Sequence, residues 1–337
     1  MRTLDWGHPI RAHGRSLADR RWQNRRQPMT TATTLRTTRT ISPATQGWLL
    51  GALGVAIFAM SIPMTRLASG SAAEPQLPAV FVAIGRAALA GLLALGWLAA
   101  SRAAWPRPEQ WRQLALTALG VVFGWPLFLG FAVLHVDAVH AAVVTGVLPI
   151  ATAVVGALLL RQRPGRGFWA CALLGTALVL GFAAWKGGAG FQAADGLLLI
   201  AVLLGAFGYV QGARLSSGPA ASAMPAEQVI CWVLVLSLPI TLPVALWTWP
   251  AAPVKASAWG GFLYVSVFSM WLGFFAWYRG LALGGTLRVS QVQLLQPFLS
   301  MWFAVPLLGE KLDAATIGFS LAVMATVFLS KRFGAPK

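Results

Sequence analysis

The chain has 337 residues, of which 57% are hydrophobic and only 10% are charged, yet Lys and Arg outnumber Asp and Glu by 26 to 9, for a formal net charge of +17. A soluble domain has about a quarter of its residues charged, and a disordered or nucleic-acid-binding basic protein is poor in large apolar residues. The composition therefore excludes these classes and indicates a protein embedded in a lipid bilayer.

Residues 1–46 form a basic, Arg- and Thr-rich segment without an apolar core, which excludes a secretory signal peptide. Its composition resembles a transit peptide, but the Arg-over-Lys usage of this Ala- and Gly-rich chain favours a high-GC bacterial genome, where a transit peptide has no role. We expect a disordered cytoplasmic tail that contacts anionic lipid rather than nucleic acid. Because Met29-Thr30-Thr31-Ala32 would suit a short-tailed start, residues 1–28 are a candidate for an untranslated extension.

Ten apolar runs of about 20 residues follow, the length at which a helix crosses ~30 Å of hydrocarbon. They lie near 47–66, 78–100, 112–134, 139–160, 168–185, 196–214, 227–247, 258–279, 287–308 and 314–331. Backbone groups that face lipid must be hydrogen-bonded internally, so spans of this length must be helices. No connection is long or polar enough to form a soluble domain.

Positive charges orient the spans, because Lys and Arg are retained on the cytoplasmic side of short loops. With the N-terminus inside, the outer connections carry only Arg66, Lys186, Lys255 and Lys311. The inner connections and the C-terminus carry a larger set: Arg102, Arg107, Arg112, Arg161, Arg163, Arg166, Arg214, Arg279, Arg288, Lys331, Arg332 and Lys337. We therefore expect a multi-pass protein of the bacterial inner (plasma) membrane with both termini in the cytoplasm.

The chain also contains a duplication at an offset of 148 residues. At this offset Arg66-Leu67-Ala68-Ser69-Gly70 aligns with Arg214-Leu215-Ser216-Ser217-Gly218, Trp111 with Trp259, Pro149 with Pro297, and Leu159-Leu160 with Leu307-Leu308. The halves, 47–185 and 195–333, then hold five spans each, and because five is odd the second half enters the membrane the opposite way up. The predicted fold class is an all-α polytopic membrane protein whose ten transmembrane helices form two inverted five-helix repeats. Secondary transporters use this architecture, with substrate bound near the midplane between the halves.

Motifs in both halves carry a family resemblance. The second half reads Leu294-Leu295-Gln296-Pro297-Phe298 and then Leu307-Leu308-Gly309-Glu310-Lys311-Leu312, and span 2 contains Gly85-Arg86-Ala87. Over 47–333 the chain resembles two EamA domains of the drug/metabolite transporter superfamily, whose repeat ends in a helix with a mid-span proline, a Leu-Gly-Glu boundary and a final helix. The resemblance implies a transporter, with amino acids, nucleosides, sugars and hydrophobic xenobiotics as substrate classes.

Two positions depart from the family pattern. Leu160-Arg161-Gln162 replaces the first Leu-Gly-Glu boundary, which removes an acidic residue from a helix end and is interpreted as structural. Gln296 stands where the family often has Glu before Pro, which weakens the inference of cation or proton binding on that helix.

Few polar groups lie within the spans. Arg86 is one, and an uncompensated charge there costs roughly 3 kcal/mol or more. It would face a cavity and bind a substrate carboxylate or phosphate, or it would snorkel or bond helix-end carbonyls instead. Gln293 and Gln296, three residues apart, share a helical face and are expected to line the cavity; the alternative is interhelical hydrogen bonding.

Prolines and aromatic residues complete the candidate site. Pro149 and Pro297 lie at equivalent depths in the two halves and are expected to kink their helices. The remaining candidates for the cavity wall are Tyr209, Gln211, Trp125, Trp271 and Trp277. Neutral amides and aromatics with one arginine favour amino-acid-like or related amphipathic metabolites.

Acidic residues lie at span ends or in loops, which disfavours a proton antiporter built on an embedded carboxylate. Two driving forces stay open: the substrate gradient itself, or protons coupled through His135, His140 or Asp137 at the outer face.

The sequence predicts no enzyme, no cofactor and no metal site. Cys171 and Cys231 lie in apolar runs, and the four histidines form no zinc motif. The predicted function is a secondary transporter that exports or exchanges a small metabolite by alternating access, as a monomer or homodimer whose partners are its substrate and the bilayer and not nucleic acid. A channel or lipid flippase of the same architecture is the alternative, and a membrane-embedded enzyme is the least supported, since a mid-span acid–base constellation is missing.

Overall fold

The computed structural model describes residues 42–159, 165–186, 192–216, 223–284 and 290–333. The N-terminal segment 1–41 and the stretch Leu160-Arg161-Gln162 lie outside the described residues, so the expectations for them stay predictions. Within the described ranges all regular elements are helices, apart from one isolated bridge between Gly70 and Pro75.

The first half runs from α1 to α7. Its elements are α1 (Pro43–Ser69), η1 (Phe81–Gly85), α2 (Arg86–Ala100), α3 (Pro108–Ala118), η2 (Leu119–Gly124), α4 (Trp125–Ala132), α5 (Ala138–Thr145), α6 (Leu148–Leu159) and α7 (Arg166–Lys186). The second half contains α8 (Ala193–Ser216), α9 (Ala226–Trp247), α10 (Ala256–Leu263), η3 (Tyr264–Leu272), α11 (Gly273–Gly284), η4 (Ser290–Leu295), α13 (Gln296–Leu308) and α14 (Ala314–Phe333).

Seven described segments are long and apolar enough to cross a bilayer: Pro43–Ser69, Phe81–Ala100, Pro108–Ala132, Ala138–Leu159, Ala193–Ser216, Ala226–Trp247 and Ala256–Leu281. Three further apolar helices are shorter in the described residues: Arg166–Phe182, Gln296–Leu308 and Ala314–Thr326. The expectation of ten full-length spans is therefore met at seven positions. At span 9 one cause is visible, since Ser290–Leu295 form the 3₁₀ helix η4 instead of α-helix.

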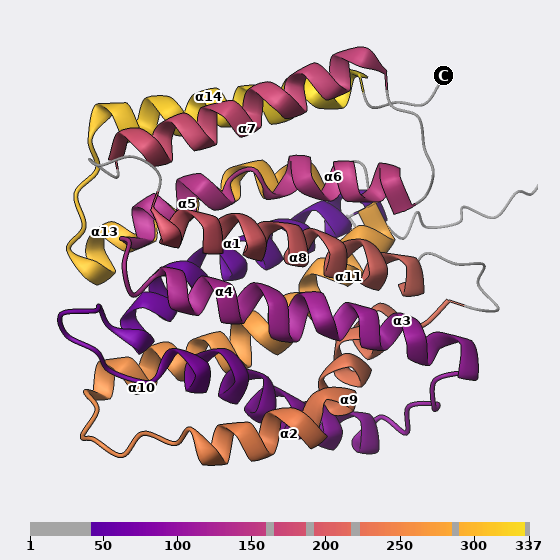
Figure 1. Cartoon of the computed structure of the whole chain (residues 1–337). Helices are drawn as coiled ribbons and strands as arrows, with labels where there is room; N and C mark the ends of the chain where they lie inside the picture. Colours follow the sequence, from indigo (N-terminus) through magenta and orange to yellow (C-terminus); the bar gives the residue numbers. More distant parts are fainter. Residues whose placement is uncertain (1–41, 160–164, 187–191, 217–222, 285–289, 334–337) are drawn as a thin grey trace, which may run out of the picture. The chain divides into compact units, whose positions relative to one another are not determined.

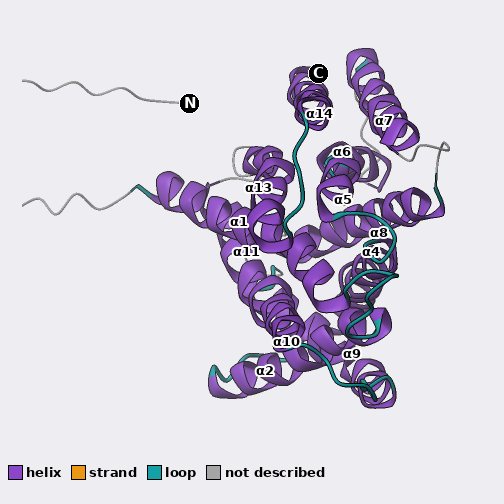
Figure 2. Ribbon diagram, turned by 90° about the vertical axis from the view of Figure 1, so that its left-hand side faces the viewer, coloured by secondary structure: helices purple, strands orange, loops and turns teal. Residues whose placement is uncertain are grey.

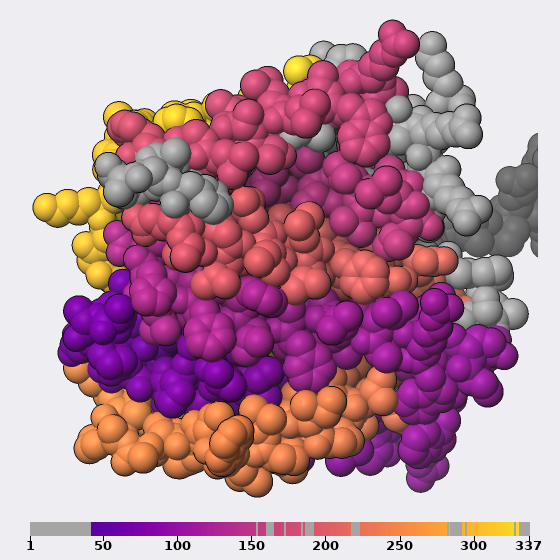
Figure 3. All heavy atoms as spheres, viewed as in Figure 1, coloured from indigo at the N-terminus to yellow at the C-terminus, as the bar shows by residue number. Residues whose placement is uncertain are grey.

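The helices of the two halves pack in matching pairs. α2 lies against α9, and α7 lies against α14 at one side of the bundle (Figures 1 and 2). α1 packs on α11 and α13, while its counterpart α8 packs on α4 and α6. Each contact thus recurs with the halves exchanged, which gives the bundle a two-fold pseudosymmetry. Figure 3 shows the consequence on one face, where segments of the two halves alternate instead of forming two separate bodies.

Small residues bring the central helices together. A Cβ added to Gly120 of η2 would lie 2.4 Å from the Leu204 carbonyl oxygen and 2.6 Å from Gly208 of α8. At the α1–α11 contact, a Cβ on Gly280 would lie 2.7 Å from the backbone nitrogen of Gly51. Helices in membranes associate through such close backbone approaches. Lipid tails are as apolar as the side chains, so the hydrophobic effect does not drive apolar helices together.

Three spans contain a π-helical stretch: η1 in span 2, η2 in span 3 and η3 in span 8. A π-helix inserts one extra residue per turn and re-aims the side chains that follow it, and such stretches are frequent at functional sites. Here the three stretches converge on one internal cavity, described next.

Candidate functional site

The first cavity, here called the Arg86 cavity, is a narrow space of about 30 Å³ between the two halves. Its lining residues are Phe58, Ser61, Arg86, Val121, Trp125, Gly205, Tyr209, Ser269, Met270, Phe274 and Gln296. Arg86 directly follows η1, Trp125 directly follows η2, and Ser269 and Met270 belong to η3. The π-helical stretches therefore determine which side chains reach this space.

Arg86 is 4% exposed and links span 2 to span 8. Its Nη2 atom donates to the Ser269 hydroxyl at 3.1 Å and lies 3.6 Å from the Met270 sulfur. The Ser61 hydroxyl lies within hydrogen-bond distance of both Ser269, at 2.6 Å, and the Ile57 carbonyl oxygen, at 3.3 Å. Because Ser61 has one proton, it donates to only one of these partners, and Ser269 donates to Ser61 when Ile57 accepts that proton.

The second cavity, the proline cavity, is smaller, at about 10 Å³. It is lined by Ile62, Ala142, Thr145, Gly146, Leu148, Pro149, Gln293, Gln296, Pro297 and Ser300. Gln296 lines both cavities, so the two spaces adjoin.

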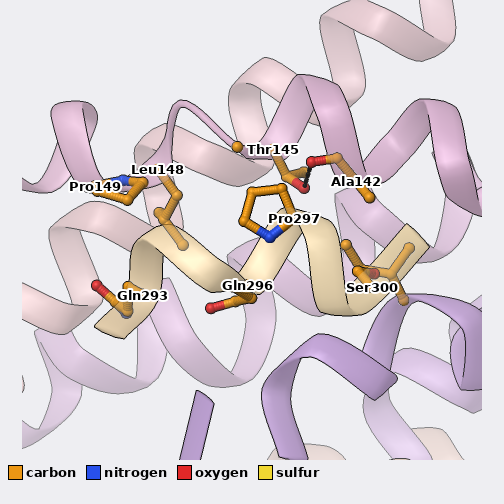
Figure 4. Close-up of a pocket in the computed structure, with 10 residues that line it drawn as sticks. Ala142, Thr145, Leu148, Pro149, Gln293, Gln296, Pro297 and Ser300 are labelled. Atoms are coloured by element: carbon orange, nitrogen blue, oxygen red, sulfur yellow. Dashed lines mark hydrogen bonds between the residues drawn. The ribbon is translucent and has the colours of Figure 1, made fainter. Parts of the chain in front are cut away.

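Both cavity prolines follow a break in their helix. The chain leaves α-helical geometry between α5 and α6, just before Pro149, and Pro297 is the second residue of α13 after the 3₁₀ helix η4. Figure 4 shows the Pro297 ring beside Thr145 and Leu148 at the α5–α6 break. A Cβ on Gly146 would lie 3.1 Å from the Pro297 ring, so only a small residue fits at this break.

The lining residues are related by the sequence offset of 148. Three pairs separated by 148 line the proline cavity, namely Thr145 and Gln293, Leu148 and Gln296, and Pro149 and Pro297. Two more line the Arg86 cavity: Ser61 and Tyr209, and Val121 and Ser269. Equivalent positions of the two halves thus meet across the same spaces, as expected for a site on a pseudo-two-fold axis.

Unpaired polar atoms gather in these cavities. Of seven buried side-chain polar atoms without a hydrogen-bond partner in the described residues, three belong to lining residues: Arg86 Nε, Gln293 Nε2 and Ser300 Oγ. Buried polar atoms are normally paired. These three atoms therefore lack the partner that a buried polar atom normally has.

The structure brings most candidate residues from the sequence together: Arg86, Tyr209, Trp125 and Gln296 line the Arg86 cavity, and Gln293, Gln296, Pro149 and Pro297 line the proline cavity. It places three elsewhere. Gln211 is two residues from Tyr209 and hence on another side of α8, where it accepts from Arg214 at 3.5 Å. Trp271 donates to Cys231 of α9 at 3.4 Å, and Trp277 packs against Gly54 and Phe58 of α1.

Sequence reasoning missed Ser269, Met270, Phe274, Thr145 and Ser300. For Thr145 a signal existed, because it is the 148-offset partner of Gln293. Ser269 and Met270 sit in a π-helical stretch, whose register differs from that of the α-helix assumed for the span.

A third, polar cavity of about 220 Å³ lies where α5, α8 and α14 begin. Its lining includes His135, Asp137, His140, Gln192, Glu310 and Lys311. The buried Asp195 lies 2.6 Å from His140 Nε2 and also accepts from the Gln192 amide. His140 is thus held by a buried partner rather than solvated.

Glu310, from the Leu-Gly-Glu stretch, caps a helix of the other half. Its two carboxylate oxygens accept from the backbone amides of Ala138 and Val139 at 2.8 and 2.7 Å, at the first turn of α5. Burial raises the pKa of the Glu310 carboxyl, and the two amide donors oppose that shift. The boundary motif therefore ties the end of α13 to the start of α5. In the described part of the chain, His, Cys, Asp and Glu form no group that could hold a metal ion.

Comparison with known proteins agrees with this architecture. The pattern of the EamA-like transporter family matches twice, at residues 45–184 and 192–331. The chain is 41% identical over 297 residues to the "Uncharacterized transporter YdeK" of Bacillus subtilis (strain 168), covering 87% of this chain and 99% of that protein. A solved structure titled only "Crystal structure of protein" has the same fold, with a TM-score of 0.56 at 17% identity over 84% of this chain and 95% of the other. The chain belongs to the EamA-like transporter family and is a multi-pass membrane transporter.

Proposed function

We propose that this protein is a secondary transporter that exports or exchanges a small, amino-acid-like or amphipathic metabolite across the bacterial cytoplasmic membrane by alternating access. In this proposal the chain spans the membrane ten times as two inverted repeats, with both termini in the cytoplasm. The Arg86 cavity and the proline cavity together form the substrate site.

The observation that carries the proposal is the meeting of repeat-equivalent residues across the two cavities. Two halves that alternate between equivalent arrangements need a shared site at their interface, reached from either side. Pro149 and Pro297 support this, because breaks at equivalent positions leave backbone groups free to face substrate and provide hinges. The unpaired Arg86 Nε, Gln293 Nε2 and Ser300 Oγ also favour small-molecule binding over a purely structural core.

Counterflow in proteoliposomes tests the function directly. Purified full-length protein is loaded with unlabelled metabolites, and uptake of labelled ones is measured across a panel of amino acids, organic acids, nucleosides and sugars. Accelerated exchange of one class supports a carrier, whereas uncoupled conductance or lipid scrambling would instead indicate a channel or flippase. Arg86→Ala and Gln293→Ala should each lower the exchange rate about tenfold or more. If both variants transported like the parent, the site assignment would be wrong.

Topology has its own test. A single cysteine at Lys255 should react with a membrane-impermeant maleimide added outside intact cells, and one at Arg163 should not. The native Cys171 and Cys231 are buried and give a low background. The reverse labelling pattern would contradict cytoplasmic termini.

A further inference from the structure

Charge at the Arg86 cavity points to a substrate class. Among the described residues that line either central cavity, Arg86 is the one charged residue, and it is almost completely buried. A cation held in the bilayer interior requires a counter-charge or a polar ligand. The first question is therefore whether the protein itself supplies an anion.

Within the described residues it does not, because every acidic side chain lies away from the Arg86 cavity. Three form ion pairs, Glu74 with Lys255, Asp137 with Arg66, and Glu227 with Arg279. Asp195 contacts His140, Glu310 binds the α5 amides, Asp313 accepts from the Thr316 amide, and Glu109 lies in the first turn of α3. The remaining acids, Asp5 and Asp19, lie in the N-terminal segment outside the described residues. Arg86 thus has no protein counter-ion within the described part of the chain.

The donors around Arg86 are arranged for an oxyanion. Among the described residues Arg86 Nε has no hydrogen-bond partner, and only part of the guanidinium's bonding capacity is used by Ser269 and Met270. A carboxylate beside Arg86 would receive donors from the guanidinium, in the planar geometry that this group favours.

The rest of the Arg86 cavity is apolar. Phe58 and Phe274 meet edge to face with ring centroids 4.9 Å apart, and Trp125 adds a third aromatic wall. These rings favour the apolar part of a substrate over a second charged group.

We infer that the transported substrate is a monoanion, a single carboxylate on an apolar body without an ammonium group. This inference rests on the proposed function, since it takes the Arg86 cavity to be the substrate site. A zwitterionic amino acid would leave the site with its net positive charge, and a dianion would exceed the one cation available. Only a monoanion leaves the occupied site neutral, which is the state that crosses a low-dielectric interior with the least penalty.

The test compares molecules that share an apolar body and differ in whether they carry a carboxylate, an ammonium group or both. Two triplets serve: 3-phenylpropionate, phenylalanine and phenethylamine, and 4-methylpentanoate, leucine and 3-methylbutylamine. Binding of each to the full-length protein in lipid nanodiscs is measured by titration calorimetry at pH 7.5. We expect each carboxylate to bind about tenfold or more tightly than its amino acid, and the amine to bind weakest. Because this ranking uses the unaltered protein, misfolding of a variant cannot produce it.

Variants then assign the preference to Arg86. Arg86→Gln should abolish the advantage of the carboxylate over the amino acid, and Arg86→Lys should retain part of it. Arg279→Gln is the matched control, since Arg279 pairs with Glu227 at an exposed helix end, and it should leave the ranking unchanged.

Failure of the inference and failure of the proposed function are distinguishable. Equal or tighter binding of the amino acids or amines would overturn the monoanion inference while leaving a carrier intact. The same holds if the counterflow panel reveals exchange of some solute but none of the six compounds binds. If no solute of the panel is exchanged, the proposed function itself fails.

Discussion

Gly120→Ala should destabilise the bundle at the crossing of η2 and α8. The new Cβ would lie 2.4 Å from the Leu204 carbonyl oxygen and 2.6 Å from Gly208, both of them backbone contacts that no side-chain rotation can relieve. Restoring ordinary contact requires the two helices to separate by about 1 Å in a close-packed interior. Overpacking of this kind costs roughly 1–3 kcal/mol, and removing a helical glycine returns about 0.5–1 kcal/mol. We expect a net loss of about 1–2 kcal/mol.

The measurement is the free energy of unfolding in mixed micelles, obtained by titration with SDS. Gly96→Ala is the matched control, because Gly96 lies within α2 and a Cβ there meets nothing within 4 Å. The control should be more stable than the parent by about 0.5–1 kcal/mol. Two alanine variants of equal stability would refute the close crossing of η2 and α8, and with it the packing that holds Tyr209 opposite Trp125.

Three further outcomes are expected. Glu310→Gln should lower the free energy of unfolding by roughly 1 kcal/mol at pH 7.5. Because burial raises the pKa of Glu310 in the folded protein, the parent should gain stability relative to this variant as the pH falls towards 5. Thermal unfolding that shows the opposite trend would contradict the buried cap. His140→Ala should cost roughly 1–3 kcal/mol by leaving the buried Asp195 carboxylate without its side-chain partner, and adding Asp195→Asn should recover part of that loss in the same SDS titration. Pro297→Ala should change the free energy of unfolding by less than about 1 kcal/mol. It should nevertheless slow counterflow, because the α-helix can then extend through η4 and narrow the proline cavity. Unchanged counterflow would show that the helix break does not depend on the proline.

Much of the candidate site can be predicted from the sequence, because the residues stand out in their local sequence or recur in both halves. Arg86 is recognisable as a lone charge in an apolar run, and Gln293 and Gln296 as amides one helical turn apart. Pro149 and Pro297 are recognisable because the duplication aligns them. The same offset could have been applied to every candidate residue, which would have added Thr145 opposite Gln293.

The rest depends on packing that a single sequence does not encode locally. Trp271 and Trp277 lie in a span that changes from π-helix to α-helix at Gly273, so a simple helical projection does not predict which face each one occupies. The link from Arg86 to Ser269 joins residues 183 positions apart, and composition does not indicate it. Glu310 was read as part of a family boundary, but its role as a cap for α5 appears only when the two halves are packed together.

The Glu310 cap has a further consequence for a carrier of the proposed kind. At the 148-residue offset its counterpart in the first half is Gln162, an uncharged amide. Two identical halves would give the two end conformations equal free energy, and the empty carrier would spend equal time open to each side. A carboxylate present in one half only makes the conformation in which it is bonded the deeper of the two wells. In a carrier of the proposed kind, this asymmetry would favour an empty state in which that face is closed.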